Sequence, residues 1–406
     1  MYGKKYIKLN TYNISVFLFS LLPILIVTGP ALPDLALLIL IVIFFFQKFK
    51  IEKKIYFYYF LLFYIYLNIR SFFSTDIIFS LKSTIPYFRF GLLIIVTSFL
   101  FKNLDFFFKI LLFFFIFIFS ILIIDGYFQF FFGQNIIGIK QFDPSRVSSF
   151  FLGKLVLGSY LVRLLPILCS LIFYTNNKKY IKLIPLIILL TGVLILFSGE
   201  KAALGLFIIE VFVIFVIFSY QQGKKYFLLI IPITIFMFVI LYSSAPLKKR
   251  LITDAISNSG YGNYIFSRVH DSHFKTAFNM FLDNPLFGKG PNTFRLLCDE
   301  KKYNINEFSC STHPHNIYIQ LLAETGLIGF CFVAFFFVYI FINLLKVFIN
   351  ILKKRKINPV ESFLCLSVFV NLFPIATTGN FFNNWTSIIY YFSFSLYLNY
   401  LKLKRK

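Results

Sequence analysis

The sequence is poor in acidic residues, and in charged residues of either sign. Only 16 of its 406 residues are Asp or Glu, 40 are Lys or Arg, and charged residues make up 14% of the chain. No carboxylates cluster as a catalytic magnesium would need, and no close Cys/His set supports zinc. The chain is instead 59% hydrophobic, contains 61 Phe and has a mean hydropathy of +0.81. This composition lies outside the range of soluble domains and predicts an integral membrane protein.

The basic residues give a net charge of +24, which in a soluble protein would suggest a nucleic-acid partner. Here they fall mostly in short clusters between apolar runs, a pattern typical of membrane orientation. We therefore expect membrane lipids as partners and no nucleic acid. The N-terminal segment is basic and is followed by two successive apolar segments with no small-residue cleavage site. We therefore expect no cleavable signal peptide.

Apolar runs near the length of a bilayer predict an all-α protein with about twelve transmembrane helices, and residues 1–406 as a single polytopic membrane domain. The predicted spans are about 14–29, 33–47, 55–69, 87–101, 107–124, 154–174, 181–197, 202–220, 226–243, 322–345, 360–376 and 385–401.

The basic clusters beside these spans predict the orientation of the chain. Under the twelve-span count they fall on the side of the two termini, which the positive-inside rule places in the cytoplasm. Segments 125–153 and 198–201 and a large loop, 244–316, then face outward. Lys248, Lys249 and Arg250 in this loop are only a weak exception, because long loops translocate largely regardless of charge.

The large loop is not featureless. Apolar residues recur at helical spacing over about 264–283, which predicts a helix lying along the membrane surface. Cys298 and Cys310, with eleven residues between them, are candidates for a disulfide if the loop lies in an oxidising compartment, and two free thiols are the alternative.

The loop ends in a histidine pair, His313 and His315. Thr312 and Pro314 suit the start of a helix, and apolar residues run at helical spacing from Ile317. We therefore expect His315 at or just outside a helix N-terminus, at the edge of the membrane.

The outward-facing segments also concentrate cations, namely Arg146, Lys201 and Arg268. A neutral histidine among cations suits transfer from a phosphate-activated donor. The imidazole accepts the proton of an incoming hydroxyl, while the cations stabilise the departing pyrophosphate. The plainer alternative is a capped helix end with solvated charges.

Two other sets of residues have their own alternatives. His270 and His273 could form a zinc site with the histidine pair, but no Cys or carboxylate is spaced to complete it, so we expect no metal and no cofactor. Arg163 and Glu210 lie inside predicted spans, and we expect them to pair with each other. Otherwise they would mark a charged pathway through the helices, as in a transporter. A structural membrane scaffold is a third possibility.

Several short motifs resemble one known superfamily. They are His313-Pro-His315-Asn316 with Leu321, Leu322, Glu324-Thr-Gly326 and Gly329; Ser198-Gly-Glu-Lys201; Arg268 with Asn284-Pro-Leu-Phe-Gly288-x-Gly290; and Arg146-Val-Ser-Ser-Phe. Together they span about 140–385 and resemble the O-antigen ligase and O-antigen polymerase superfamily. The corresponding core region would be 185–345.

The resemblance implies a metal-independent, inverting glycosyltransferase of the bacterial inner membrane, with its active site in the periplasm. The donor would be a glycan on undecaprenyl pyrophosphate. The acceptor would be lipid A-core for a ligase, which we favour, or a second lipid-linked glycan for a polymerase. A transporter of a polyprenyl-linked sugar is the other alternative.

The same resemblance implies roles for individual residues. His315 would be the general base, and Arg268 and Lys201 would hold the pyrophosphate. The remaining substrate-binding candidates are Arg146, His313 and Asn316. The superfamily usually has Arg where this chain has Lys201. Lysine keeps the positive charge but cannot form the bidentate hydrogen bonds of a guanidinium.

Overall fold

The structure is a computed structural model that describes residues 10–47, 55–260 and 267–403. These residues form helices and connecting loops, with two isolated β-bridges and no strand among them. The predicted all-α class is therefore confirmed. In a membrane, helices satisfy the backbone hydrogen bonds of apolar segments internally, which is why such a composition folds this way.

The helices of the first half are α1 (Thr11–Val27), α2 (Ala31–Phe45), α3 (Ile55–Phe72), α4 (Ile77–Thr84), α5 (Phe88–Leu100), α6 (Leu104–Phe132), α7 (Leu157–Tyr174), α8 (Lys178–Ile181), α9 (Ile184–Phe197) and α10 (Lys201–Gln222). Those of the second half are α11 (Ile230–Ser243), α12 (Ala245–Lys248), α13 (Asp254–Gly260), α14 (Arg268–Asp283), α15 (Phe294–Leu297), α16 (Ile317–Leu352), α17 (Pro359–Asn371) and α18 (Asn384–Leu403). Short 3₁₀ segments occur at Ile85–Tyr87, Phe101–Asn103, Ser149–Phe151 and Lys224–Leu229, and a π-turn at Lys249–Thr253.

Six described stretches are long and apolar enough to cross a membrane. They are Ile77–Phe132, Leu157–Tyr174, Lys178–Phe197, Lys201–Gln222, Lys224–Ser243 and Ile317–Leu352. Helices α1, α2 and α17 are apolar but shorter. The chain is thus a multi-pass membrane protein. Each of the twelve predicted spans overlaps a helix, but the count of twelve transmembrane helices stays a prediction.

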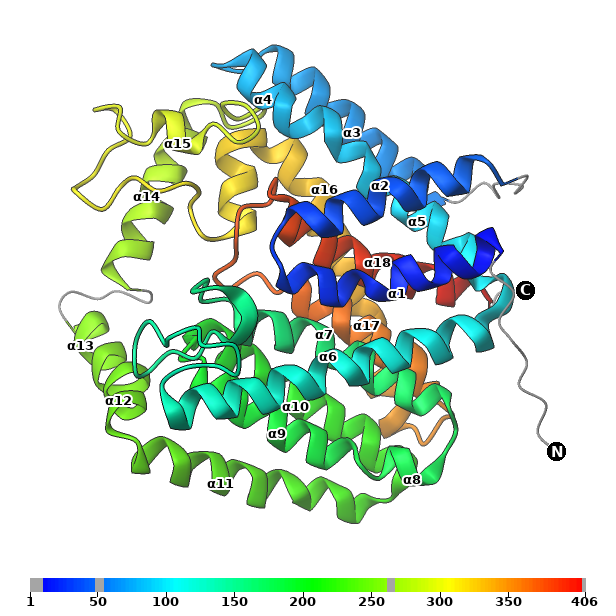
Figure 1. Ribbon diagram of the computed structural model, residues 1–406. Coiled ribbons are helices and arrows are strands. Elements are labelled where there is room, and N and C mark those ends of the chain that lie inside the picture. Colours follow the sequence, from blue (N-terminus) through cyan, green and yellow to red (C-terminus); the bar gives the residue numbers. More distant parts are fainter. Residues whose placement is uncertain (1–9, 48–54, 261–266, 404–406) are drawn as a thin grey trace.

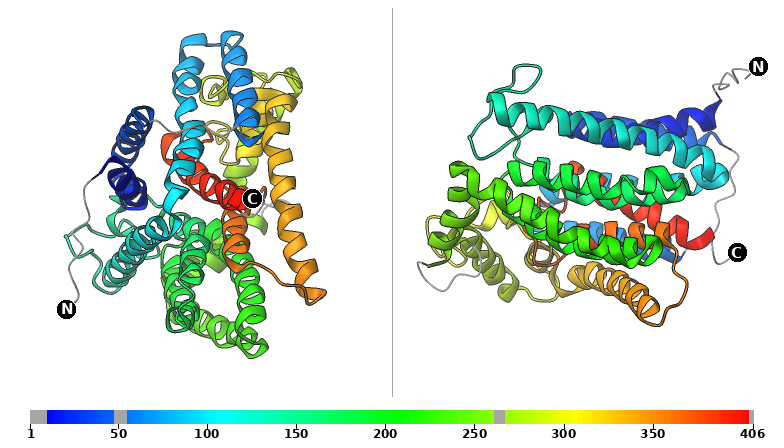
Figure 2. Two further views of the ribbon diagram at one scale, coloured as in Figure 1. Left: turned by 90° about the vertical axis from the view of Figure 1, so that its right-hand side faces the viewer. Right: turned by 90° about the horizontal axis from the view of Figure 1, so that it is seen from below.

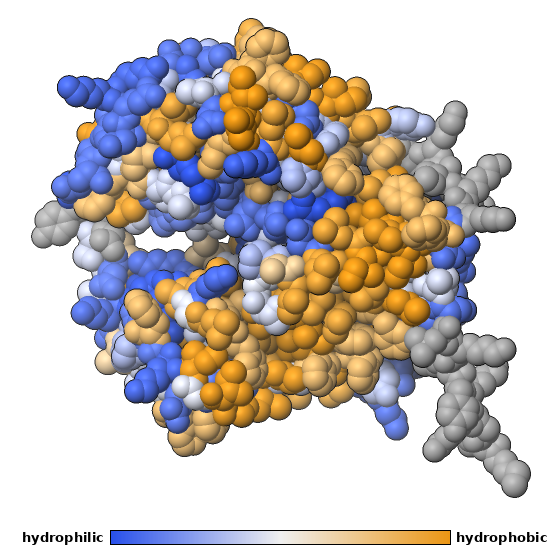
Figure 3. Space-filling model, turned by 45° about the horizontal axis from the view of Figure 1, so that its top comes forward, coloured by the Kyte–Doolittle hydropathy of each residue, from blue (hydrophilic) through white to orange (hydrophobic). Residues whose placement is uncertain are grey.

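The long helices run between two ends of the molecule. The start of α1 and the end of α18 lie at one end, and α12 to α15 lie at the other, which we call the loop end (Figures 1 and 2). α7 is buried along most of its length and packs against α17, while α18 packs against α5. Polar residues gather at the loop end around an opening, and apolar residues cover much of the face beside it (Figure 3).

The predicted surface helix corresponds to α14, which begins at Arg268 after the N-cap Ser267. The first part of the predicted range, 264–266, lies outside the described residues. α14 is amphipathic and packs against α16, with Ala277 and Met280 fully buried.

α16 is interrupted at Gly326, where φ is 63° and ψ is −169°. The turn Asn284–Gly290 docks against this break and replaces the missing helical hydrogen bonds. Its last two backbone amides donate to the carbonyls before Gly326 at 2.9 and 2.8 Å, and the amide after Gly326 donates to a carbonyl of the turn at 2.8 Å. The break is thus satisfied by protein, as an interrupted membrane helix requires, and it fixes the loop against the start of α16.

Candidate active site

A polar cavity of about 800 Å³ lies at the loop end. Four of the predicted site residues line it, namely Arg146, Lys201, His313 and His315. They come from segments far apart in sequence: the loop after α6, the first residue of α10 and the segment before α16. The cations Lys154, Arg163, Arg250 and Arg295 also line the cavity. We call this space the cation cavity.

His315 is held at the N-terminus of α16, as expected, but the N-cap lies four residues further on than the sequence suggested. Asn316, not Thr312, is the N-cap, and its side chain accepts from the amides of Tyr318 and Ile319 at 3.0 and 3.1 Å. Asn316 also donates to the carbonyl of Pro374 at 2.7 Å. Asn316 is therefore occupied in placing His315, and it is not part of the cavity wall.

The other three histidines of the chain gather around His315. Its ring centroid lies 4.1 Å from that of His313, 5.2 Å from that of His270 and 5.3 Å from that of His273. The described residues nevertheless contain no group of three or more His, Cys, Asp or Glu arranged to hold a metal ion. The hypothetical zinc site therefore receives no geometric support.

The histidines near the cavity are neutral at physiological pH. Burial, and to a lesser extent the neighbouring imidazoles, lower the pKa of His315 to about 3. Burial also lowers the pKa of His313 to about 4. Nε2 of His313 lies 3.2 Å from the carbonyl of Thr378, which can only accept, so this nitrogen carries the proton. His315 is thus available in its basic form.

Arg146 lies in a loop that is tied to the end of α6. Asp125 accepts from the hydroxyl of Ser149 at 2.5 Å, and Gln129 accepts from the amides of Ser148 and Ser149 at 2.9 and 2.6 Å. These bonds explain why polar residues occur at the end of a helix as apolar as α6. They hold Arg146 at the wall of the cavity, where burial and the nearby Arg250 lower its pKa.

Lys201 is positioned by the residue before it. Glu200 turns toward the start of α7, where its carboxylate accepts from the amides of Gly158 and Ser159 at 2.7 and 3.1 Å and from the Ser159 hydroxyl at 2.6 Å. Burial raises the pKa of Glu200, and these hydrogen bonds oppose the rise. Glu200 thus joins the starts of α7 and α10 beside the cavity.

Arg268 is placed differently from the other predicted cations. It does not line the cation cavity. Its side chain is 58% exposed, lies 3.8 Å from Glu307 and stacks over the ring of Phe308 at 5.2 Å. Its role in binding pyrophosphate stays a prediction.

Cys298 and Cys310 form a disulfide, with their Cα atoms 5.1 Å apart. The bond closes the segment between α15 and the histidine pair. Cys169 and Cys365 are buried in the helices, as expected of small apolar side chains, whereas Cys331, which we also expect to be buried in a span, is half-buried.

The predicted pairing of Arg163 with Glu210 is wrong. Arg163 lines the cation cavity and donates to the carbonyl of Ser159 at 3.1 Å. Glu210 is fully buried, and neither of its carboxylate oxygens has a hydrogen-bond partner in the described part of the chain. The two side chains point to different places because their helices are rotated independently by packing, which helical spacing alone does not reveal.

Residues 186–336 match the family model described as O-antigen ligase. Over this stretch the chain is similar to an O-antigen ligase, and we call the stretch the ligase domain. This match confirms the resemblance to the O-antigen ligase and polymerase superfamily. No curated protein matches the chain significantly. The ligase domain contains Lys201, Arg250, Arg295 and the histidine pair, whereas Arg146 lies before it.

Sequence reasoning missed two cations of the ligase domain. Arg250 lines the cavity and donates through Nε to the carbonyl of Gly199 at 2.9 Å. The sequence signal for Arg250 is the basic triplet Lys248–Arg250, which lies on the side opposite to the other basic clusters. The positive-inside rule treats this triplet only as a weak exception in a long loop. Arg295 had no comparable signal beyond following the turn that docks on α16.

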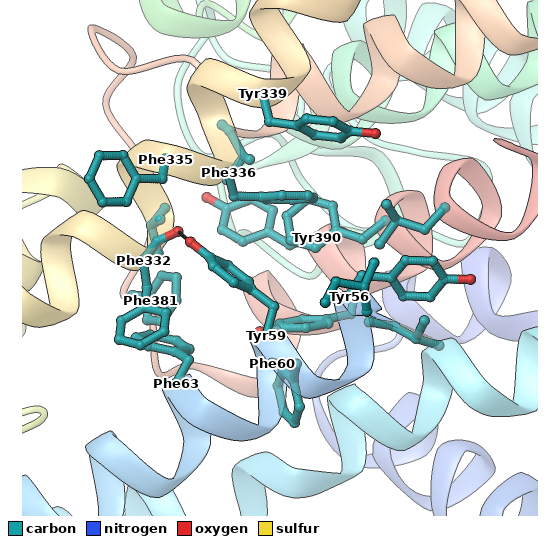
Figure 4. A pocket seen from close by; sticks show the side chains of 17 residues that line it. Tyr56, Tyr59, Phe60, Phe63, Phe332, Phe335, Phe336, Tyr339, Phe381 and Tyr390 are labelled. Carbon is teal, nitrogen blue, oxygen red and sulfur yellow. Dashed lines mark hydrogen bonds between the residues drawn. The ribbon is translucent and has the colours of Figure 1, made fainter. Parts of the chain in front are cut away.

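A second, apolar pocket of about 380 Å³ adjoins the ligase domain (Figure 4). Aromatic side chains of α3, α16 and α18 point into it, among them Tyr59, Phe332 and Phe336. Tyr390 lines both this pocket and the cation cavity. An apolar space and a cationic space thus share a wall.

Proposed function

We propose that this protein transfers a glycan from undecaprenyl pyrophosphate to lipid A-core on the periplasmic face of the bacterial inner membrane. The observation that carries the proposal is a neutral imidazole, His315, in the wall of a cavity that cations surround. The O-antigen ligase match supports a glycosyltransferase of this kind.

The proposed reaction is a single displacement. His315 takes the proton of the acceptor hydroxyl, whose oxygen forms a bond to the anomeric carbon. The bond from that carbon to the pyrophosphate breaks on the opposite face, which inverts the anomeric configuration. Negative charge develops on the leaving pyrophosphate, and the side chains of Arg146, Lys201, Arg250 and Arg295 stabilise it. These fixed cations supply the stabilisation that a metal ion would otherwise provide.

The pocket that shares Tyr390 with the cation cavity supports a lipid-linked donor. A polyprenyl chain binds to an apolar surface, and its pyrophosphate binds to cations. The two must lie close enough for one donor molecule to reach both. Aromatic side chains of α3, α16 and α18 supply the first, and the cation cavity supplies the second. A transporter has less support, because Arg163 and Glu210 do not form the charged pathway it would need.

The test is reconstitution of the purified protein with an undecaprenyl-pyrophosphate glycan and either lipid A-core or a second lipid-linked glycan. We expect transfer to lipid A-core, and we expect His315→Gln to lower kcat by at least about 100-fold, as loss of a general base does. Product formed only with the second lipid-linked glycan would favour the polymerase. Unchanged transfer by His315→Gln would refute the proposed role of this residue.

A further inference from the structure

A third cavity, of about 460 Å³, lies beside the cation cavity. The two share the lining residues Pro30, Arg295, Asn380 and Asn383, so they adjoin. The rest of the lining combines amides and a hydroxyl with aromatic rings and charged side chains, namely Asn292, Asn384, Ser83, Tyr87, Phe90, Phe382, Asp34, Lys82 and Arg89. We call it the amide cavity.

Asparagine side chains of the amide cavity are held in a hydrogen-bonded chain. Asn292 donates to the hydroxyl of Ser83 at 2.9 Å, and Asn380 donates to Oδ1 of Asn292 at 2.8 Å. Gln320 of α16 in turn donates to Oδ1 of Asn380 at 2.8 Å. The chain links α4, the turn before α15, α16 and the segment before α18, so the amide wall is rigid before any ligand binds.

One of the cations of the amide cavity is compensated. Arg89 pairs with Asp34 at 2.6 Å and donates to Oδ1 of Asn384 at 2.5 Å. Lys82 and Arg295 also line the cavity and add positive charge to its wall. The wall therefore suits a polyhydroxylated ligand, whether neutral or acidic.

Asn383 stands where the two cavities meet. Its Oδ1 accepts from the amide of Trp385 at 2.8 Å, so its NH₂ group is the part that can donate to a ligand. The side chain is exposed and lines both cavities. Rings of Tyr87, Phe90 and Phe382 line the amide cavity as well.

We propose that the amide cavity binds a sugar ring of the glycan next to the reacting centre. Fixed amides match ring hydroxyls, aromatic rings match the apolar faces of sugars, and the volume falls within the range of about 300–1,000 Å³ for small-molecule sites. The inference rests on the proposed glycan transfer. The sugar belongs either to the acceptor or to the donor.

Trp385 provides a direct binding assay, because it is the single tryptophan of the chain and lines the cation cavity next to Asn383. Purified protein in nanodiscs would be titrated with hexoses, N-acetylhexosamines and 6-deoxyhexoses, and separately with inorganic pyrophosphate. At least one sugar should change the tryptophan emission. Absence of a response to every sugar would overturn the proposed subsite.

Asn383→Ser is the informative variant, because its hydroxyl can still accept from the Trp385 amide, as an N-cap serine does, while the NH₂ donors are lost and no charge is added. We expect it to weaken sugar binding roughly tenfold, as loss of one hydrogen bond does. Asn177→Ser is the matched control: Asn177 caps α8 through the same contact, at 2.9 Å, and lines neither cavity. Equal sugar affinity in both variants would overturn the subsite.

Measuring pyrophosphate binding distinguishes failure of this proposal from failure of the proposed function. Lys201→Gln should weaken pyrophosphate binding and leave the tryptophan response to sugar intact. Unchanged pyrophosphate binding in this variant would count against the cation cavity alone. In the transfer assay, Asn383→Ser should raise the KM for either acceptor or donor. The substrate whose KM rises identifies the source of the sugar, and two unchanged KM values would overturn the subsite.

Discussion

His315 shows how one residue acquires its chemistry from its surroundings. Its imidazole is an ordinary base in water, but at the start of α16 it is packed among three other imidazoles and partly removed from solvent. Both effects disfavour the imidazolium form, which is why its pKa falls to about 3. The neighbouring histidines therefore keep this imidazole unprotonated at neutral pH, and they also lower its basicity.

The lowered pKa values predict how stability depends on pH. Imidazole in the unfolded chain titrates near 6.5, whereas His315 and His313 titrate at about 3 and about 4 when folded. Below pH 6.5 the unfolded chain binds more protons than the folded protein, so the free energy of unfolding decreases as the pH falls from 6.5 toward 3. The melting temperature of the purified protein should therefore drop between pH 7 and pH 5.

His315→Gln removes one of the groups responsible, so its melting temperature should fall less steeply over the same pH range. Differential scanning fluorimetry at several pH values measures both slopes. Equal slopes for the variant and the unmodified protein would contradict the folded-state pKa of His315.

At the scale of elements, the site depends on the break in α16. The turn Asn284–Gly290 fits into the break through backbone hydrogen bonds, and this docking carries α14 and α15 with it. α14 brings His270 and His273 to His315, and α15 brings Arg295 to the cavity. A continuous α16 would leave the turn without these partners.

Gly326→Ala tests this arrangement. At φ 63° and ψ −169° the backbone is accessible only to glycine, and a Cβ would collide with the backbone of Leu286. We expect the substitution to destabilise the protein by at least about 1–3 kcal/mol and to lower its melting temperature. Gly205→Ala in α10 is the control, because a Cβ there meets no atom within 4 Å. An unchanged melting temperature for Gly326→Ala would contradict the break.

At the scale of the whole molecule, the loop end and the end that holds the start of α1 and the end of α18 lie at opposite ends of the long helices (Figure 1). That arrangement agrees with the basic clusters, although the membrane sides themselves follow from charge alone. The proposed site at the loop end would then face the periplasm, where its donor is presented.

Cysteine labelling in intact cells tests this orientation. In a chain without its free cysteines, Lys301→Cys in the large loop should react with a membrane-impermeant maleimide from outside. Lys356→Cys, between α16 and α17, should react only after the membrane is opened. Both side chains are exposed in the structure, so accessibility depends on the side of the membrane. Reversed labelling would invert the predicted topology.

The sequence by itself determined the helical membrane class, because long apolar segments leave the backbone no other way to satisfy its hydrogen bonds in lipid. It also predicted that His315, Lys201, Arg146 and Arg268 lie at one edge of the membrane, because they come from segments on the same side of the predicted spans. The candidate disulfide followed from two cysteines within one loop.

Only the tertiary structure decided which other side chains join them. Arg250 and Arg295 enter the cavity and Arg268 does not line it, because the rotation of a short helix depends on contacts with distant segments. The separation of Arg163 from Glu210 has the same origin. Spacing along one helix predicts which residues share a face, but packing against other helices determines where that face points.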